Sequence, residues 1–141
     1  MRKKRHWRPG IVLALTAALC GCGHWMSYYD NTSYKNLTDL KAETTFLFET
    51  LKTHPDQKSQ DPVLQQLRLD VEKAYEYERG KAGNADTVAQ LAEIRRMLVG
   101  VSTLLRQKDE LPDEYLDPKL ADLSKAFDMA IQTEASKLKP D

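Results

Sequence analysis

Cysteine and histidine, two side chains that often bind metals or take part in catalysis, are few in this chain. The two cysteines, Cys20 and Cys22, lie one residue apart at the end of an apolar run. A disulfide between them would close a strained ring, and redox pairs usually have two intervening residues. His24 lies in the segment before the first predicted helix and His54 in a predicted loop, whereas a metal or haem site in a helical bundle needs ligands on inward helical faces. We therefore expect no disulfide, no metal site and no cofactor.

Motifs that would indicate an enzyme are also missing from the sequence. No Gly-x-Ser-x-Gly motif is present, and a Ser/His/Asp arrangement would have to use a histidine from a loop. The loop RGKAGN at residues 79–84 is rich in glycine, but it follows a predicted helix and lacks the spacing of a phosphate-binding loop. The composition of this loop is explained by a glycine that ends a helix, a solvated lysine and an asparagine cap. We expect the protein not to be an enzyme.

The first residues have the three-part organisation of a secretory signal peptide. A basic start is followed by an apolar stretch at residues 11–19 and then by small residues. As a helix, that stretch would reach roughly 14 Å, about half of the ~30 Å hydrocarbon core of a bilayer. A cleaved signal peptide is therefore favoured over a spanning helix. The basic residues before Cys22 are Arg2, Lys3, Lys4, Arg5 and Arg8.

The end of this segment, Leu19-Cys20-Gly21-Cys22, resembles the lipobox of bacterial lipoprotein precursors. That motif has an aliphatic residue at −3, a small residue at −1 and then the cysteine that receives lipid, so Cys22 fits as the acylated residue. Cys20 fits poorly because Leu19 would stand at −1, and as the −2 residue Cys20 departs from the commoner Ala or Ser. The resemblance covers residues 1–22 only. It implies an envelope protein held in the lipid bilayer by Cys22, and Gly23 in place of an aspartate retention signal favours the outer membrane, facing the periplasm.

Three segments follow from this resemblance: a signal peptide at residues 1–21, a lipidated tether at residues 22–32 and a helical domain at residues 33–139. The precursor carries 21 basic and 21 acidic residues. Removal of the five basic residues before Cys22 leaves 16 against 21, a net charge of −5. Nucleic-acid binding depends largely on neutralising phosphates with basic side chains, so we expect no nucleic-acid partner.

Apolar residues of the domain recur at intervals of three and four, which predicts helices rather than strands. Four helices joined by short polar loops favour an all-α protein with an antiparallel four-helix bundle. Gly80 is predicted to end the second helix in a left-handed conformation, and Asn84 or Asp86 to cap the third. The other predicted boundaries are a first helix at about Ser33–Lys52, a second beginning at Asp61-Pro62 and a fourth beginning at Asp117-Pro118. The predicted core stripes are Leu37, Leu40, Thr44, Leu47, Phe48 and Leu51; Leu64, Leu67, Val71, Ala74 and Tyr75; Val88, Leu91, Ile94, Leu98, Val101 and Leu105; and Leu120, Leu123, Phe127, Ala130, Ile131 and Leu138.

Glu78 and Glu134 occupy equivalent positions in the second and fourth helices, which resemble each other at an offset of 56 residues. A duplicated helical hairpin would produce this likeness, and so would similar capping of two amphipathic helices. Each glutamate falls near the middle of an apolar stripe but close to the end of its helix, where a long side chain can reach water. We expect both carboxylates to be solvated.

Two surface features could contact a partner. Phe46 and Met129 point away from the predicted core, and Phe46 is a candidate anchor residue. The two connections at the end of the bundle remote from the tether carry Asp56, Asp61, Asp109, Glu110, Asp113, Glu114 and Asp117. These carboxylates would either attract a basic partner or serve as helix caps and solvated loop residues. The candidate partner-binding residues are Phe46, Asp109, Glu110, Asp113, Glu114 and Tyr115.

The function predicted from these features is that of a lipid-anchored, non-enzymatic protein whose helical domain binds another envelope protein in an assembly, scaffold or accessory role. The alternative is a carrier or chaperone for a small apolar ligand or lipid. A carrier needs a cavity, whereas the inward positions are mostly Leu, Val, Ile and Phe, which favour a filled core.

The resemblance to lipoprotein precursors gives a first testable prediction. Labelled fatty acid should enter the full-length protein, should be lost in Cys22→Ser and should be kept in Cys20→Ser, because Cys22 is the residue that fits the modified position. Label retained in Cys22→Ser and lost in Cys20→Ser would move the mature start to Cys20.

Overall fold

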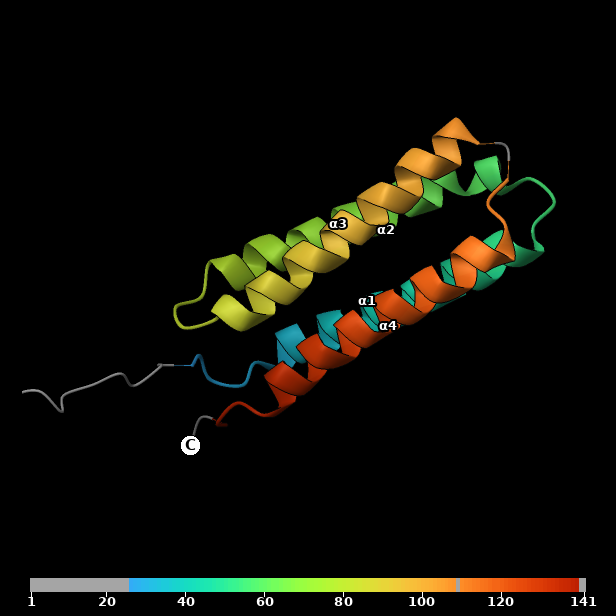
Figure 1. Cartoon of the computed structure of the whole chain (residues 1–141). Helices are drawn as coiled ribbons and strands as arrows, with labels where there is room; N and C mark the ends of the chain where they lie inside the picture. The colour runs from blue at the N-terminus through green and yellow to red at the C-terminus, as the bar shows by residue number, and fades with distance from the viewer. Residues whose placement is uncertain (1–25, 109, 140–141) are drawn as a thin grey trace, which may run out of the picture.

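The regular structure of the protein consists of helices. The computed structural model describes residues 26–108 and 110–139, and no strand occurs in these two ranges. Consecutive α-helices run in opposite directions and lie side by side as an elongated bundle (Figure 1). The prediction of an all-helical domain is confirmed. The elements are α1 (Asn31–Thr53), the short 3₁₀ helix η2 (Gln57–Gln60), α2 (Asp61–Arg79), α3 (Ala85–Gln107) and α4 (Asp113–Ala135).

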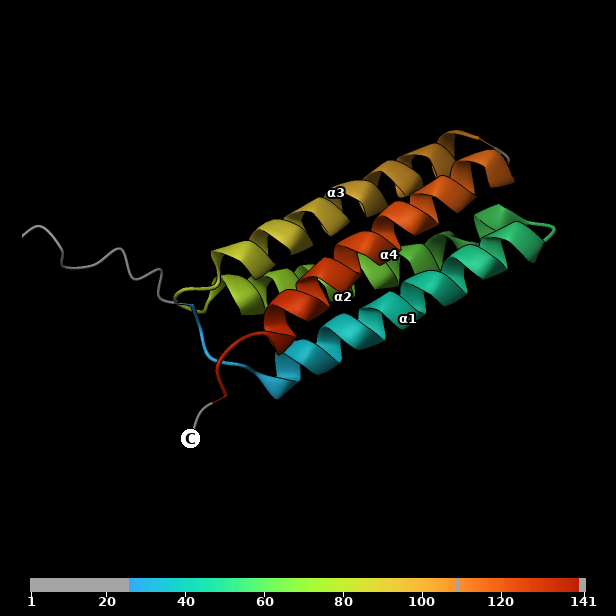
Figure 2. The same ribbon diagram turned by 60° about the horizontal axis from the view of Figure 1, so that its bottom comes forward.

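The order of the helices around the bundle determines which loops meet. Each helix packs against its neighbours in the chain, and α4 closes the arrangement by packing against α1 (Figure 2). The start of α1, the α2–α3 loop and the end of α4 therefore meet at one end of the bundle, which we term the tether end. The α1–α2 and α3–α4 connections meet at the opposite end, which we term the far end.

The apolar stripes of the four helices face one another and form a single core. All six stripe residues predicted for α1 are buried, and Phe48 and Phe127 are wholly enclosed. Phe46 and Met129 point outward, as predicted, with Phe46 72% exposed. The prediction for Leu138 was wrong: this residue is 78% exposed because α4 ends at Ala135 and its helical periodicity stops there.

Two helices begin earlier than predicted. Helix α1 starts at Asn31 because the Asp30 carboxylate accepts a hydrogen bond (2.8 Å) from the Thr32 N–H and caps the first turn. Helix α4 starts at Asp113 instead of Asp117, which places Pro118 inside the helix, where its ring removes one backbone hydrogen bond. Burial of Leu116 in the first turn offsets that loss.

The α2–α3 loop turns at a different glycine from the one predicted. Gly80 keeps a right-handed conformation, with φ −71°, and its N–H still bonds to the Glu76 carbonyl at 3.2 Å. The left-handed residue is Gly83, with φ 72°. The reversal of direction therefore occurs just before Asn84, immediately before α3 begins, and not at the end of α2.

Two leucines of α2 provide a matched test of the core. Leu67→Ala should lower the free energy of unfolding by about 2–5 kcal/mol, because it removes buried methyl groups from a filled core. Leu69→Ala, on the outer side of the same helix, should change it by less than about 0.5 kcal/mol. Urea unfolding followed by circular dichroism measures both. Equal costs at the two positions would contradict the assignment of the α2 core face.

Candidate functional site

The predicted partner-binding residues do not form one site. Cys22 and Asp109 lie outside the described residues. Glu110, Asp113 and Glu114 are exposed together at the far end, the latter two in the first turn of α4, where carboxylates are favoured by the helix dipole. Phe46 is separate from them, on the outer face of α1.

Other acidic residues of the far end already have partners within the bundle. Asp61 pairs with Arg106 at 3.2 Å, and Asp117 pairs with Lys52 at 2.6 Å. Burial acts to raise the pKa of Asp61, but hydrogen bonds from Arg106 and Gln65 outweigh it and lower that pKa below its usual range. The far end thus presents a weaker negative field than a count of its carboxylates suggests.

A buried amide holds the α3–α4 connection in place. The Gln57 side chain donates to the Leu111 carbonyl at 3.0 Å and accepts from the Leu111 N–H at 2.7 Å. Leu116, a few residues later, is buried, and Tyr115 is half-buried, which raises the pKa of its phenol. Sequence reasoning missed Gln57 because it belongs to a polar loop whose contact with Leu111 is made only in the folded chain.

The tether end contains a buried charge cluster, and here the sequence-based expectation was wrong. Glu78 is 2% exposed and Glu134 is fully buried, so neither carboxylate reaches water. A lysine follows each glutamate by three residues and pairs with it, which satisfies the charge inside the protein. The buried charge cluster consists of Asp30, Ser33, Glu78, Lys81, Asn84, Glu134 and Lys137.

Asn84 joins the two glutamate–lysine pairs. Its amide nitrogen donates to the Glu78 carboxylate, and its amide oxygen accepts from Lys137 Nζ at 2.6 Å. Lys137 also pairs with Glu134. The predicted cap of α3 therefore makes no side-chain hydrogen bond to its own helix, because both ends of its amide are used across the bundle.

Asp30 attaches the tether to this cluster. Its carboxylate pairs with Lys81 at 2.6 Å and accepts from the Tyr77 hydroxyl at 2.7 Å, while its N–H donates to Glu134 at 2.7 Å. Burial acts to raise the pKa of Asp30, but the hydrogen bonds from Lys81, Tyr77 and the Thr32 N–H hold it well below its usual range. The carboxylate is thus kept ionised at the start of α1.

Two backbone hydrogen bonds extend this attachment toward the N-terminus. The Ser27 N–H donates to the Gly83 carbonyl at 3.0 Å, and the Tyr29 N–H donates to the Leu138 carbonyl at 2.9 Å. The described part of the tether is therefore fixed against both the α2–α3 loop and the segment that follows α4.

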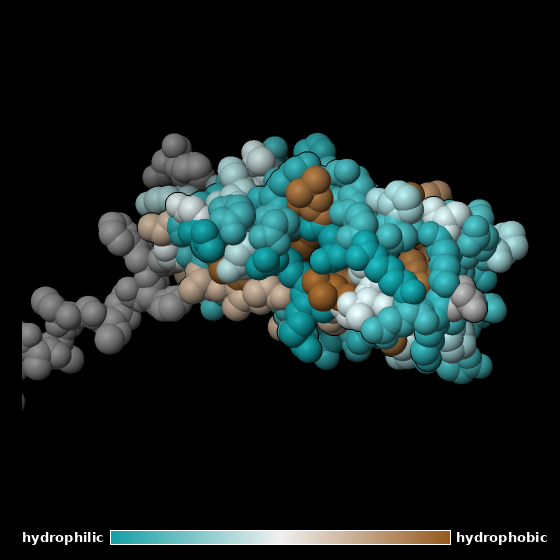
Figure 3. All heavy atoms as spheres, turned by 90° about the horizontal axis from the view of Figure 1, so that it is seen from above, coloured by the Kyte–Doolittle hydropathy of each residue, from teal (hydrophilic) through white to brown (hydrophobic). Residues whose placement is uncertain are grey.

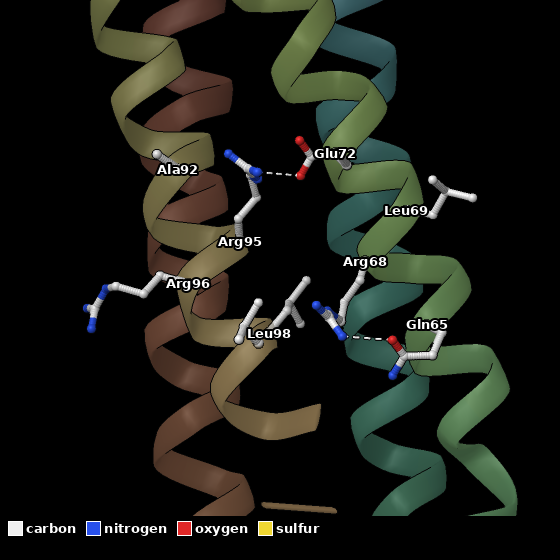
Figure 4. Close-up of a pocket in the computed structure, with 9 residues that line it drawn as sticks. Gln65, Arg68, Leu69, Glu72, Ala92, Arg95, Arg96 and Leu98 are labelled. Carbon is white, nitrogen blue, oxygen red and sulfur yellow. Dashed lines mark hydrogen bonds and ion pairs between the residues drawn. The ribbon is translucent and has the colours of Figure 1, made fainter. Parts of the chain in front are cut away.

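An open groove of about 580 Å³ runs along the outer face between α2 and α3. Arg68 from α2 and Arg95 from α3 point into it (Figure 4). Arg95 pairs with Glu72 at 2.5 Å and stacks on the Tyr75 ring, with its guanidinium carbon 4.1 Å from the ring centre. The remaining residues that line the groove are Gln65, Leu69, Ala92, Arg96, Leu98 and Val99.

Arg68 and two apolar side chains give the groove its chemical character. Arg68 donates to Gln65 at 2.7 Å and to the Ser102 hydroxyl at 3.2 Å, both neutral acceptors. Leu69 and Val99 are 49% and 45% exposed. Sequence reasoning missed this groove. Leu69 and Val99 were a possible signal, because, like Phe46 and Met129, they are apolar residues that lie outside the predicted core stripes. The arrangement can bind a surface that offers carboxylates beside apolar groups.

Comparison of the chain with models of protein families, with curated proteins and with solved structures finds no significant match in any of the three. In residues 26–108 and 110–139, no helix is long and apolar enough to cross a membrane. The same ranges contain no group of three or more His, Cys, Asp or Glu side chains placed to hold a metal ion. The function is therefore inferred from the residues and geometry of this chain alone.

The buried charge cluster gives a stability prediction. Glu134→Gln should lower the free energy of unfolding by about 3–5 kcal/mol, because it leaves the Lys137 ammonium buried without its counter-charge. Glu76→Gln removes one partner of an exposed pair with Arg79 and should cost less than about 1 kcal/mol. Urea unfolding at neutral pH measures both variants. A cost at Glu134 no larger than that at Glu76 would mean that its carboxylate reaches water.

Proposed function

We propose that this chain is a lipid-anchored lipoprotein of the bacterial cell envelope whose antiparallel four-helix bundle binds another protein and has no enzymatic role. Acylated Cys22 anchors it, and the outer membrane, facing the periplasm, is the proposed location. The observation that carries the binding role is the groove between α2 and α3, where arginines and exposed apolar side chains lie together on an outer face.

The position of the groove supports this role. Its lining on α3, residues 92–99, lies about seven to fourteen residues from the start of that helix at Ala85, which corresponds to roughly 10–20 Å from the tether end. Because residues 27–30 are fixed to the tether end, an anchor at Cys22 would leave the groove on the flank of the bundle, clear of the bilayer. A partner in the same compartment could reach it from the side.

The alternative role as a carrier of an apolar ligand is less well supported. Core positions that could have enclosed a ligand are occupied by large side chains such as Phe48, Phe127 and Leu98, each fully buried. The groove between α2 and α3 is open and lined by guanidinium groups, which suit carboxylates better than an acyl chain.

Purification of the intact lipoprotein from its own envelope, after mild cross-linking, tests the proposal. The expected result is one protein partner in a fixed ratio to the bait, with an unrelated lipoprotein of similar abundance as the control. Recovery of lipid without any protein partner would support the carrier role and overturn the proposal.

A further inference from the structure

We propose that the groove between α2 and α3 binds an acidic amphipathic helix of another protein, with a carboxylate paired to Arg68 and an apolar side chain against Leu69 and Val99. This inference rests on the proposed function and specifies its partner. It places the main contact on the flank of the bundle, and not at the acidic far end.

The charge of the groove selects an acidic partner. Three arginines and one glutamate line it, so its lining carries an excess of positive charge although the mature chain is acidic overall. Arg95 forms an ion pair with Glu72, and Arg96, at the edge of the groove, forms one with Glu93. Arg68 makes no direct ion pair with any described residue: its hydrogen bonds go to Gln65 and Ser102, and the Asp61 carboxylate interacts with it only at longer range. An incoming carboxylate would supply the direct ion pair that this half-buried guanidinium does not make within residues 26–108 and 110–139.

The apolar part of the groove requires more than an acidic loop. Leu69 and Val99 are each about half exposed, one on each of the helices that border the groove. Figure 3 looks onto the α2/α3 side of the bundle and shows patches of hydrophobic surface enclosed by hydrophilic side chains. An apolar core with a charged rim is the organisation of a protein-binding surface.

The shape of the groove favours a helix as the occupant. Its lining covers residues 65–72 of α2 and 92–99 of α3, which is roughly 10 Å or two turns along each antiparallel helix. A furrow between two such helices accepts the side-chain ridge of a third, as in helix-in-groove recognition, where apolar residues recur at intervals of three and four. An acidic residue beside that ridge would face Arg68, which points into the groove (Figure 4).

Site-specific photo-cross-linking in the protein's own cells tests this assignment on the full-length lipoprotein. The probe is p-benzoylphenylalanine, introduced at Val99 in the groove and, as controls, at Phe46 on α1 and at Met129 on α4. Irradiation should produce one protein adduct from Val99, and mass spectrometry of the cross-linked peptide should identify an acidic segment with helical apolar periodicity.

Charge variants of α2 make the test specific. Arg68→Glu should lower the Val99 adduct at least tenfold, whereas Arg68→Lys should retain most of it because the positive charge remains. Arg79→Glu reverses an exposed arginine of the same helix outside the groove and should leave the adduct unchanged. Circular dichroism of each variant confirms that the bundle is folded. Equal loss in Arg68→Glu and Arg79→Glu would overturn the role of Arg68.

The remaining outcomes separate this inference from the proposed function. A Val99 adduct with a basic segment, with lipid or with a second copy of this chain would overturn the acidic-helix assignment. Protein adducts at Phe46 or Met129 with none at Val99 would overturn the groove while leaving a protein-binding role intact. No protein adduct at any of the three positions would overturn the groove assignment, and the co-purification described above would then decide the protein-binding role by itself.

Discussion

Pairing of buried charges at the tether end is the constraint on which the rest of the structure depends. The carboxylates of Glu78 and Glu134 are removed from water and are tolerated only because Lys81 and Lys137 lie beside them. Asn84 then ties the two pairs together, so the ends of α2 and α4 and the start of α3 share one hydrogen-bonded network. Such a network is satisfied in one geometry only, so it fixes the relative positions of these helix ends more narrowly than apolar contact alone would.

The far end is held together by a buried amide and by ion pairs near the surface, and not by buried charges. This difference affects where a partner can bind. There the Gln57 amide holds Leu111, while Asp61 and Asp117 pair with Arg106 and Lys52 near the surface. These contacts use two of the seven carboxylates that the sequence places at this end. Between the two closed ends, Arg68 on the flank of α2 and α3 makes no direct ion pair with the described part of the chain and lies beside exposed apolar side chains, which is why the proposed contact lies there.

Spacing alone predicted the helices and most of their core faces, because burial of an apolar stripe depends on a local period. It failed where a contact joins distant segments. A position near the end of a helix predicts a solvated Glu134, although Lys137 follows it by only three residues. The hydrogen bond from Lys137 to Asn84 could not be predicted from local spacing, because it forms only when the helices pack together. The groove could not be predicted for the same reason. Leu69 and Val99 are separate exposed residues in the sequence, and they border one groove only because α2 and α3 lie side by side. The same glutamate–lysine spacing at the ends of α2 and α4, with each lysine just beyond its helix, fits a duplicated hairpin, and common end-capping chemistry accounts for it equally well.

Fixation of residues 27–30 also determines how the domain would bear mechanical force. A pull on the chain ahead of Ser27 first meets the backbone bonds to Gly83 and Leu138 and the ion pair between Asp30 and Lys81. The load would thereby be shared among the α2–α3 loop, the end of α2 and the segment after α4 before it reached the first turn of α1. A force applied through the N-terminal segment would thus act on several helices together, and not on α1 alone.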